Sequence, residues 1–256
     1  MDASLHDLAV RAKQAAQRLT GAGAGAKNTA LTTLSALLKE RSKDIFDANA
    51  RDMAYARDAG LDAPRLDRLC LTEKIVDDMR QACLHVATLP DPIGALDEQW
   101  QRPNGMLVGR MRIPLGVIAM IYEARPNVTI DAAILCLKAG NAVILRGGSE
   151  ALNSNIVLAE LFREALEKAD HPKDAVQLIT NQDHEIVREL CHLDQYIDVL
   201  IPRGGESLVR AVTREATMPV LKHYMGVCHA FIDADCDQDA ALEIVYNGKV
   251  QRPGVC

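Results

Sequence analysis

Two segments of the chain combine paired glycines with an arginine, and this combination suits the binding of a phosphate. The segments are VILRGGS, residues 143–149, and VLIPRGGES, residues 199–207. In each, an apolar run typical of a strand precedes the glycines and a helical pattern follows them. Glycines let a ligand approach the backbone, a helix start offers free N–H groups to an anion, and the arginine adds positive charge. The residues proposed to contact such a ligand are Arg146, Gly147, Gly148, Ser149, Arg203, Gly204 and Gly205.

The alternative is that each Gly-Gly segment only makes a tight turn, with a serine such as Ser149 capping the next helix. The occurrence of the pattern at two strand ends favours a ligand, because ligands of open α/β sheets bind at the carboxyl ends of the strands. Neither segment is the G-x-G-x-x-G fingerprint. The glycines of GAGAGA, residues 21–26, follow a helical pattern instead of a strand and are not read as a nucleotide site.

The elements that must position these turns fall into two parts. Residues 2–86 have helical apolar spacing and predict a helical layer. After Pro114, short apolar strands alternate with helices, which indicates an α/β fold with a parallel, Rossmann-type sheet covered by helices on both faces. The expected strands are GVIAMIY, NAVILRGG, VQLIT, DVLIP, MPVLK and HAFID, and the expected helices include residues 127–138, 149–168, 207–215 and 238–249.

Residues 95–113 predict a β-hairpin arm, because Asn104-Gly105 lies between two strand-like runs. An isolated hairpin is marginally stable in water, so it is expected to pack against another subunit or domain. We therefore expect a homo-oligomer that assembles through this arm.

The composition and charge of the chain limit the kinds of binding partner that we expect. The net charge is -6 with Lys and Arg scattered, which argues against nucleic acid, and the longest apolar run is about half of a membrane span. Seven cysteines without a close C-x-x-C pair indicate reduced thiols in a cytoplasmic protein. Three neighbouring Cys-His pairs do not supply a closed ligand set, so no metal is expected.

Residues 112–155, RIPLGVIAMIYEARPNVTIDAAILCLKAGNAVILRGGSEALNSN, carry a specific resemblance. PLGV followed by a strand, and then a helix leading to AGNAVILR, resembles the aldehyde dehydrogenase superfamily. YEARPNVT and ILRGGSEA narrow the resemblance to the γ-glutamyl phosphate reductase family of proline biosynthesis. DVLIPRGGESLV, KHYMGVCHAFID and QRPGVC follow in the order of that family, so the match covers nearly the whole chain.

The resemblance implies reduction of L-glutamyl 5-phosphate by NADPH, giving L-glutamate 5-semialdehyde and phosphate through a cysteine thioester. The nucleophile would be Cys256, the cysteine of QRPGVC, and a nearby cation such as Arg252 or a base such as His223 would lower its pKa. His223 could also protonate the leaving group; the alternative is a buried structural histidine. A functional link to glutamate 5-kinase is implied as well.

Asn127 resembles the superfamily's oxyanion asparagine, while the alternative is that it caps the following helix. Arg125 would meet a phosphate or a substrate carboxylate, or would form a structural ion pair. Arg146 takes the place of a lysine that contacts the adenosine ribose in the superfamily, and its guanidinium suits a 2'-phosphate, which favours NADPH over NADH.

Members of the family continue past the cysteine into a further α/β domain. We therefore expect residues 1–94 and 114–235 to form the NADPH-binding part, residues 236–256 to lead to the cysteine, and the chain alone to bind nucleotide weakly and turn over poorly. Two other hypotheses are an oxidising aldehyde dehydrogenase with another substrate and a catalytically silent nucleotide-binding or assembly module.

Overall fold

The structure, a computed structural model, describes residues 4–123, 125–222 and 228–251. The contacts within the chain divide it into two compact units, residues 1–222 and 223–256. No helix of the described residues is long and apolar enough to cross a membrane.

The N-terminal part of the first unit is helical, as the sequence predicts. Its helices are α1 (Leu5–Leu19), α2 (Ala24–Glu40), α3 (Ser42–Asp58), α4 (Ala63–Leu69) and α5 (Glu73–Thr88). Side-chain caps fix three of the starts, since Ser4, Asp62 and Thr72 each accept a hydrogen bond from a backbone N–H three residues later.

A four-stranded parallel sheet follows, with the order β5-β4-β3-β6. Its strands are β3 (Val117–Tyr122), β4 (Ala142–Arg146), β5 (Val176–Leu178) and β6 (Val199–Arg203). The connecting helices are α6 (Asn127–Lys138), α7 (Leu152–Lys168) and α8 (Glu185–Leu190), and α9 (Glu206–Glu215) follows β6; short 3₁₀ turns lie at η1 (Ser149–Ala151) and η2 (Lys173–Ala175).

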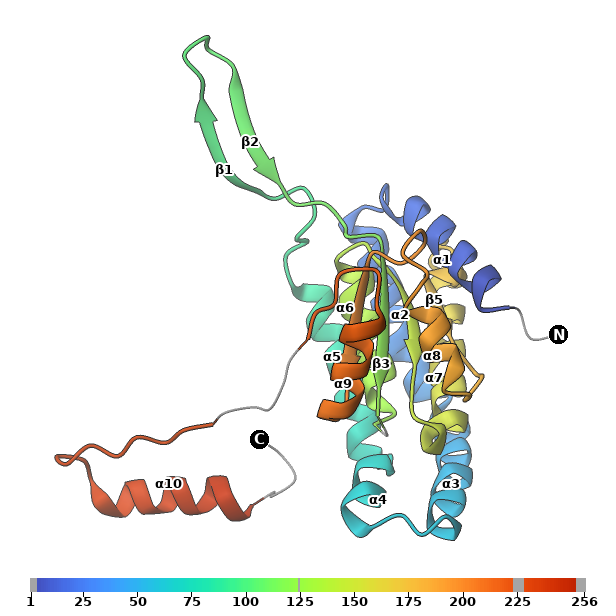
Figure 1. Cartoon of the computed structure of the whole chain (residues 1–256), viewed down its shortest axis with the longest axis vertical. Helices are drawn as coiled ribbons and strands as arrows, with labels where there is room; N and C mark the ends of the chain where they lie inside the picture. Colours follow the sequence, from blue (N-terminus) through green and yellow to red (C-terminus); the bar gives the residue numbers. More distant parts are fainter. Residues whose placement is uncertain (1–3, 124, 223–227, 252–256) are drawn as a thin grey trace. The chain divides into compact units, whose positions relative to one another are not determined.

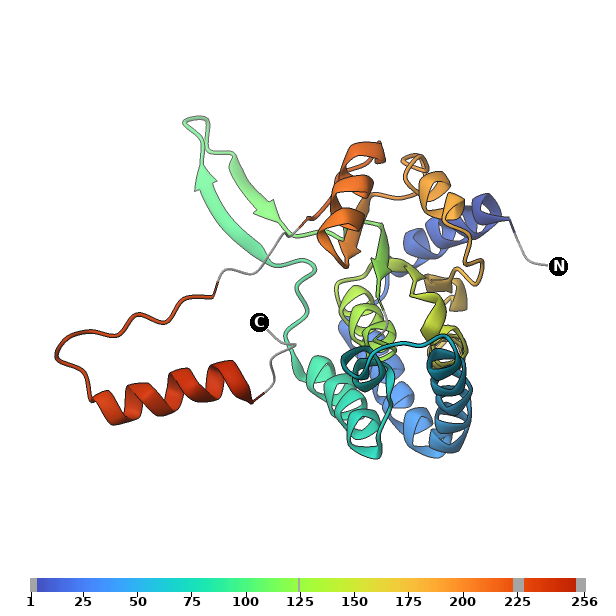
Figure 2. The same cartoon turned by 60° about the horizontal axis from the view of Figure 1, so that its bottom comes forward.

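Helices cover both faces of the sheet (Figures 1 and 2). One face is covered by α6 and α7, with α2 and α5 packed against α6; the other is covered by α1, α8 and α9. The central strands β3 and β4 are almost entirely buried, as expected for near-continuous apolar strands of a parallel sheet. The predicted α/β fold class is confirmed.

Two strand predictions, MPVLK at residues 218–222 and HAFID at residues 229–233, are wrong. Residues 218–222 form only an isolated parallel bridge, between Leu200 and Val220. Residues 229–233 are not a strand, and Phe231 is 88% exposed. An apolar run becomes a strand only when a neighbouring strand accepts its hydrogen bonds, and residues 228–251, the described part of the second unit, contain no strand.

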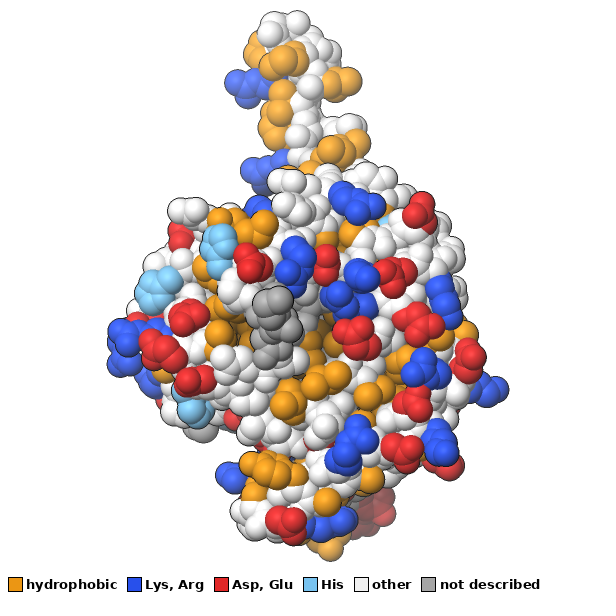
Figure 3. All heavy atoms as spheres, turned by 90° about the vertical axis from the view of Figure 1, so that its right-hand side faces the viewer, with side chains coloured by type: hydrophobic (Ala, Val, Ile, Leu, Met, Phe, Trp, Pro, Cys, Tyr) orange, Lys and Arg blue, Asp and Glu red, His pale blue; other side chains and the backbone are white. Residues whose placement is uncertain are grey.

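The predicted hairpin is present as β1 (Leu96–Gln101) and β2 (Leu107–Met111), which pair antiparallel. Gly105 in the turn has φ +85°, a conformation that glycine adopts at no steric cost. Five large apolar side chains of the arm are exposed: Leu96, Trp100, Met106, Leu107 and Met111. Figure 3 shows hydrophobic groups along the arm.

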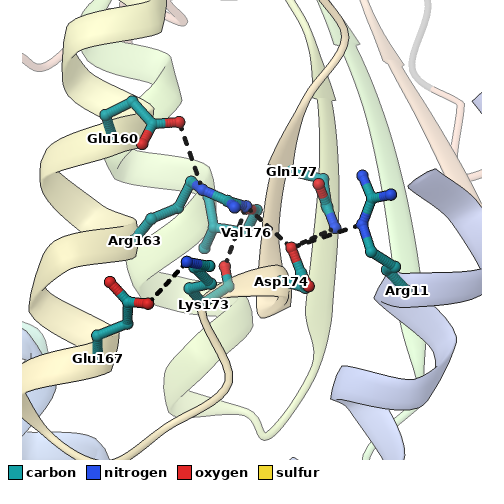
Figure 4. Close-up of polar contacts among 8 residues, drawn as sticks. All are labelled: Arg11, Glu160, Arg163, Glu167, Lys173, Asp174, Val176 and Gln177. Carbon is teal, nitrogen blue, oxygen red and sulfur yellow. Dashed lines mark hydrogen bonds and ion pairs between the residues drawn. The ribbon is translucent and has the colours of Figure 1, made fainter. Parts of the chain in front are cut away.

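Strand β5 ends the sheet on one side, and a polar cluster covers this edge (Figure 4). Arg163 of α7 donates from Nη1 to the backbone oxygen of Val176 at 2.9 Å and to Oδ1 of Asp174 at 3.3 Å. Gln177 Nε2 also donates to Asp174 Oδ1, at 3.0 Å. The bond to Val176 occupies one backbone acceptor of this end strand, and charged side chains beside such a strand discourage unwanted pairing.

In the second unit, residues 228–251 contain one helix, α10 (Gln238–Val250). Its start is capped by Asp237, whose Oδ1 accepts from the N–H groups of Asp239 and Ala240. None of its residues is buried, and Leu242, Ile244 and Tyr246 are exposed.

Candidate functional site

The two Gly-Gly turns lie at the same edge of the sheet, on either side of β3. In the strand register Ile121 pairs with Arg146 of β4, and Tyr122 pairs with Arg203 of β6. The carboxyl ends of three neighbouring strands therefore bring both arginines and both glycine pairs together. This is the edge where open α/β sheets bind ligands.

Arg146 ends β4 and is half-buried. Its Nη2 donates to the backbone oxygen of Gln182 at 3.3 Å, while its buried Nε has no hydrogen-bond partner in the described residues. Burial lowers the pKa of this guanidinium, and the nearby Glu150 carboxylate acts in the opposite direction. An arginine remains charged under such a shift, so Arg146 offers an unused donor to an anion.

Gly147 has no room for a side chain. A Cβ built on it would lie 2.2 Å from Asn155 Nδ2 and 3.1 Å from Tyr122 Cε2. Beneath the glycine, Thr129 Oγ1 lies 2.7 Å from the Tyr122 hydroxyl and donates to Asn155 Oδ1 at 2.9 Å. Burial raises the pKa of Tyr122, so its hydroxyl stays protonated. The backbone of the first turn thus rests on a fixed, neutral polar network.

Ser149 does not cap α7. It begins the 3₁₀ turn η1, makes no capping bond and lies 3.4 Å from a Glu150 carboxylate oxygen. Asp52 of α3 does the capping: its buried carboxylate accepts from the N–H groups of Asn153 and Ser154 at 3.0 and 2.7 Å and from both side chains. The sequence could not reveal this contact, because 101 residues separate Asp52 from Asn153.

The second turn leads into α9, with Gly205 as its N-cap residue. A Cβ on Gly204 would lie 2.8 Å from Leu208 Cδ2 and 3.1 Å from Glu123 Oε1. Oε1 of Glu123 also accepts a 2.7 Å hydrogen bond from the N–H of Gly205. Sequence reasoning did not single out Glu123, although its place directly after β3, in YEARPN, was a signal.

Asn127 is the first residue of α6, and Pro126 precedes it as the N-cap residue without a side-chain cap. The alternative that Asn127 caps the helix is therefore wrong. Its Nδ2 donates to Asp131 Oδ2 at 2.9 Å, one turn further along. Burial raises the pKa of Asp131, opposed by this hydrogen bond. Arg125, two residues before Asn127, is exposed.

Three predicted site residues, His223, Arg252 and Cys256, lie outside the described residues. Among the described cysteines, Cys83, Cys136 and Cys191 are buried, and burial raises the pKa of all three, to about 12 for Cys83 and Cys136. A thiol with that pKa is protonated at neutral pH and is a poor nucleophile. The described residues contain no group of three or more His, Cys, Asp or Glu side chains that could hold a metal ion.

A nicotinamide dinucleotide would fit the residues of this edge. Gly147 and Gly204 leave no room for a Cβ, so each turn presents bare backbone, and within the described residues the buried Nε of Arg146 has no hydrogen-bond partner. Both features suit the close approach of a phosphate to the backbone and to a guanidinium.

Comparisons with known proteins agree with this architecture. The model of the family described as "Aldehyde dehydrogenase family" matches residues 2–256. The γ-glutamyl phosphate reductase of Desulfovibrio desulfuricans is 66% identical over 249 residues, which are 97% of this chain and 59% of that protein. The γ-glutamyl phosphate reductase of Nitratidesulfovibrio vulgaris strain Hildenborough is 60% identical over 98% of this chain and 60% of its own length.

The chain is also similar to solved structures of γ-glutamyl phosphate reductases. The crystal structure of the Thermotoga maritima γ-glutamyl phosphate reductase superposes with a TM-score of 0.93 at 41% identity, over 99% of this chain and 61% of that one. The Saccharomyces cerevisiae γ-glutamyl phosphate reductase superposes with a TM-score of 0.79 at 30% identity, over 97% of this chain and 63% of that one. The chain thus spans about three fifths of the length of these relatives. It belongs to the aldehyde dehydrogenase family, whose members use a nicotinamide cofactor.

Proposed function

We propose that the chain is the nucleotide-binding part of a γ-glutamyl phosphate reductase, an enzyme of proline biosynthesis. The observation that carries the proposal is the 66% identity with the D. desulfuricans protein over nearly the whole chain. The paired glycine turns at one sheet edge support it. The substrate would be L-glutamyl 5-phosphate, supplied through a functional link to glutamate 5-kinase, and the reaction would take place in the cytoplasm.

In the proposed reaction the thiolate of Cys256 attacks the acyl carbon of L-glutamyl 5-phosphate. A carbon–sulfur bond forms, the carbon–oxygen bond to phosphate breaks, and inorganic phosphate leaves. The cofactor, when bound, supplies a hydride to the thioester carbon. The resulting thiohemiacetal then expels the thiolate and gives the aldehyde. Arg252 or His223 would favour the thiolate, and His223 could protonate the leaving group.

Asn127 is the proposed donor to the oxygen that becomes negative in each addition step. Its amide nitrogen carries two protons, and the bond to Asp131 uses one of them. The second proton is available for an oxyanion, for which a fixed donor contributes a few kcal/mol. Arg125, which is exposed at the same turn, would contact the phosphate or the substrate carboxylate.

Arg146 is the proposed determinant of cofactor choice. Its Nε, which has no hydrogen-bond partner among the described residues, and its position at the end of β4 support contact with the 2'-phosphate of NADPH. The glycines of both turns, together with Ser149 and Arg203, would border the phosphates and the nicotinamide side of the cofactor.

The test uses the protein completed to the length of its relatives. We expect NADP reduction with L-glutamate 5-semialdehyde to require phosphate and to be lost in Cys256→Ser, while Cys228→Ser, a change of another cysteine, retains it. Turnover that persists in Cys256→Ser, or that does not depend on phosphate, would contradict the proposed reaction.

A homo-oligomer that forms through the hairpin arm is the second part of the proposal. Five large apolar side chains of β1, β2 and their turn are exposed, and a two-stranded ribbon by itself is only marginally stable in water. A second copy of the chain would cover them.

A further inference from the structure

The carboxylate of Glu123 occupies the position at the start of α9 where an anion would bind. Glu123 directly follows β3, and its Oε1 accepts a 2.7 Å hydrogen bond from the N–H of Gly205. The first N–H groups of a helix have no partner within the helix and attract negative charge. The chain itself supplies that charge here.

The same side chain covers the glycine turn. A Cβ on Gly204 would lie 3.1 Å from Glu123 Oε1 and 3.2 Å from its Cγ, and a Cβ on Gly205 would lie 3.6 Å from Oε1. A phosphate that approached the N–H of Gly205 would need the volume that this carboxylate fills. It would also be repelled by the carboxylate charge.

The contact is not needed to hold the two strands together. Tyr122 and Arg203, the residues just before Glu123 and Gly204, are already paired in the β3–β6 ladder. Glu123 is exposed, so its side chain can turn into solvent without leaving a buried charge unpaired. A movable carboxylate on a fixed turn is suited to exchange with a ligand.

We propose that Glu123 competes with the cofactor pyrophosphate for the start of α9. It binds the Gly205 N–H before the dinucleotide arrives and turns away when a phosphate takes its place. Glu123 thereby lowers the affinity of the site for the dinucleotide. This inference rests on the proposed function, since it concerns the same nucleotide site.

The test is a calorimetric titration of the 256-residue chain and its Glu123→Gln variant with NADPH and, separately, with inorganic pyrophosphate. Glutamine keeps the shape and one acceptor but removes the charge, so we expect both ligands to bind about fivefold more tightly or better. Glu215→Gln is the matched control, because it removes the same charge at the opposite end of α9. Its affinities should equal those of the parent chain.

Melting curves without ligand check that each variant is folded. If the parent chain binds NADPH and Glu123→Gln binds it equally or more weakly, the inference is overturned while the proposed function stands. If no folded variant binds NADPH, the nucleotide site itself is wrong and the inference fails with it.

Discussion

At the scale of single residues, Gly147 shows how tightly the first turn is built on its surroundings. A methyl group there would meet the buried Asn155 side chain and the Tyr122 ring, both held by hydrogen bonds. We expect Gly147→Ala to lower the free energy of unfolding by about 1–3 kcal/mol, the usual cost of overpacking. Urea denaturation of the parent chain and the variant measures this difference in the free energy of unfolding.

The neighbouring glycine is the control for this prediction. The three atoms nearest to a Cβ on Gly148 all belong to the carboxylate end of Glu150, a flexible side chain that can move. Gly148→Ala should therefore lower the free energy of unfolding by less than half of the amount expected for Gly147→Ala. Equal losses for the two variants would show that the network under Gly147 does not confine the turn.

Cysteine reactivity is a second prediction at this scale. Because burial raises the pKa of Cys83 and Cys136 to about 12, both are protonated at pH 8 and shielded from reagents. Cys228 is exposed. Brief iodoacetamide treatment of the native chain should label Cys228 and leave Cys83 and Cys136 unmodified, as measured by peptide mass spectrometry. Labelling of Cys83 or Cys136 before unfolding would disprove the burial argument.

At the scale of elements, Asp52 fixes the start of α7 from a different helix. Four donors from Asn153 and Ser154 converge on its buried carboxylate. Asp52→Ala leaves these donors unsatisfied, and we expect a loss of about 3 kcal/mol of stability. Asp47→Ala, an exposed change on the same helix α3, should stay within about 0.5 kcal/mol. Similar losses for both would contradict the capping role.

Periodicity predicted many of the elements because their signals are local. The helix expected over residues 127–138 is found as α6 with the same bounds. The helix expected to start at Ser149 begins instead at Leu152, since Asp52 binds the N–H groups of Asn153 and Ser154. Contacts between distant segments are invisible to periodicity, which is also why Glu123 was missed.

The glycine turns themselves were predictable from the types and spacing of their residues, and the structure brings both turns to one sheet edge. The side chains around them depend on tertiary packing. The Nε of Arg146, without a partner in the part of the chain that the structure describes, and the place of Glu123 at α9 both follow from how β3, β4 and β6 align, which no single segment encodes.

At the scale of the whole molecule, the hairpin arm is expected to join copies of the chain. Trp100 is 39% and Leu107 is 72% exposed, so the double change Trp100→Ser and Leu107→Ser should shift the chain from oligomer to monomer in sedimentation velocity. Tyr55→Ser removes an aromatic side chain of α3 that is 63% exposed, and it should leave the sedimentation coefficient unchanged. A parent chain that is already monomeric at micromolar concentration would contradict assembly through the arm.

We expect the sheet edge beside Arg146 to bind a dinucleotide and the Arg146 guanidinium to contact its 2'-phosphate. The most direct measurement is the melting temperature of the chain with NADPH, with NADH and without nucleotide, for the parent and for Arg146→Ala. We expect NADPH to raise the melting temperature of the parent more than NADH does, and the difference to vanish in the variant. No shift with either nucleotide, or a preference for NADPH that survives in Arg146→Ala, would contradict the claim.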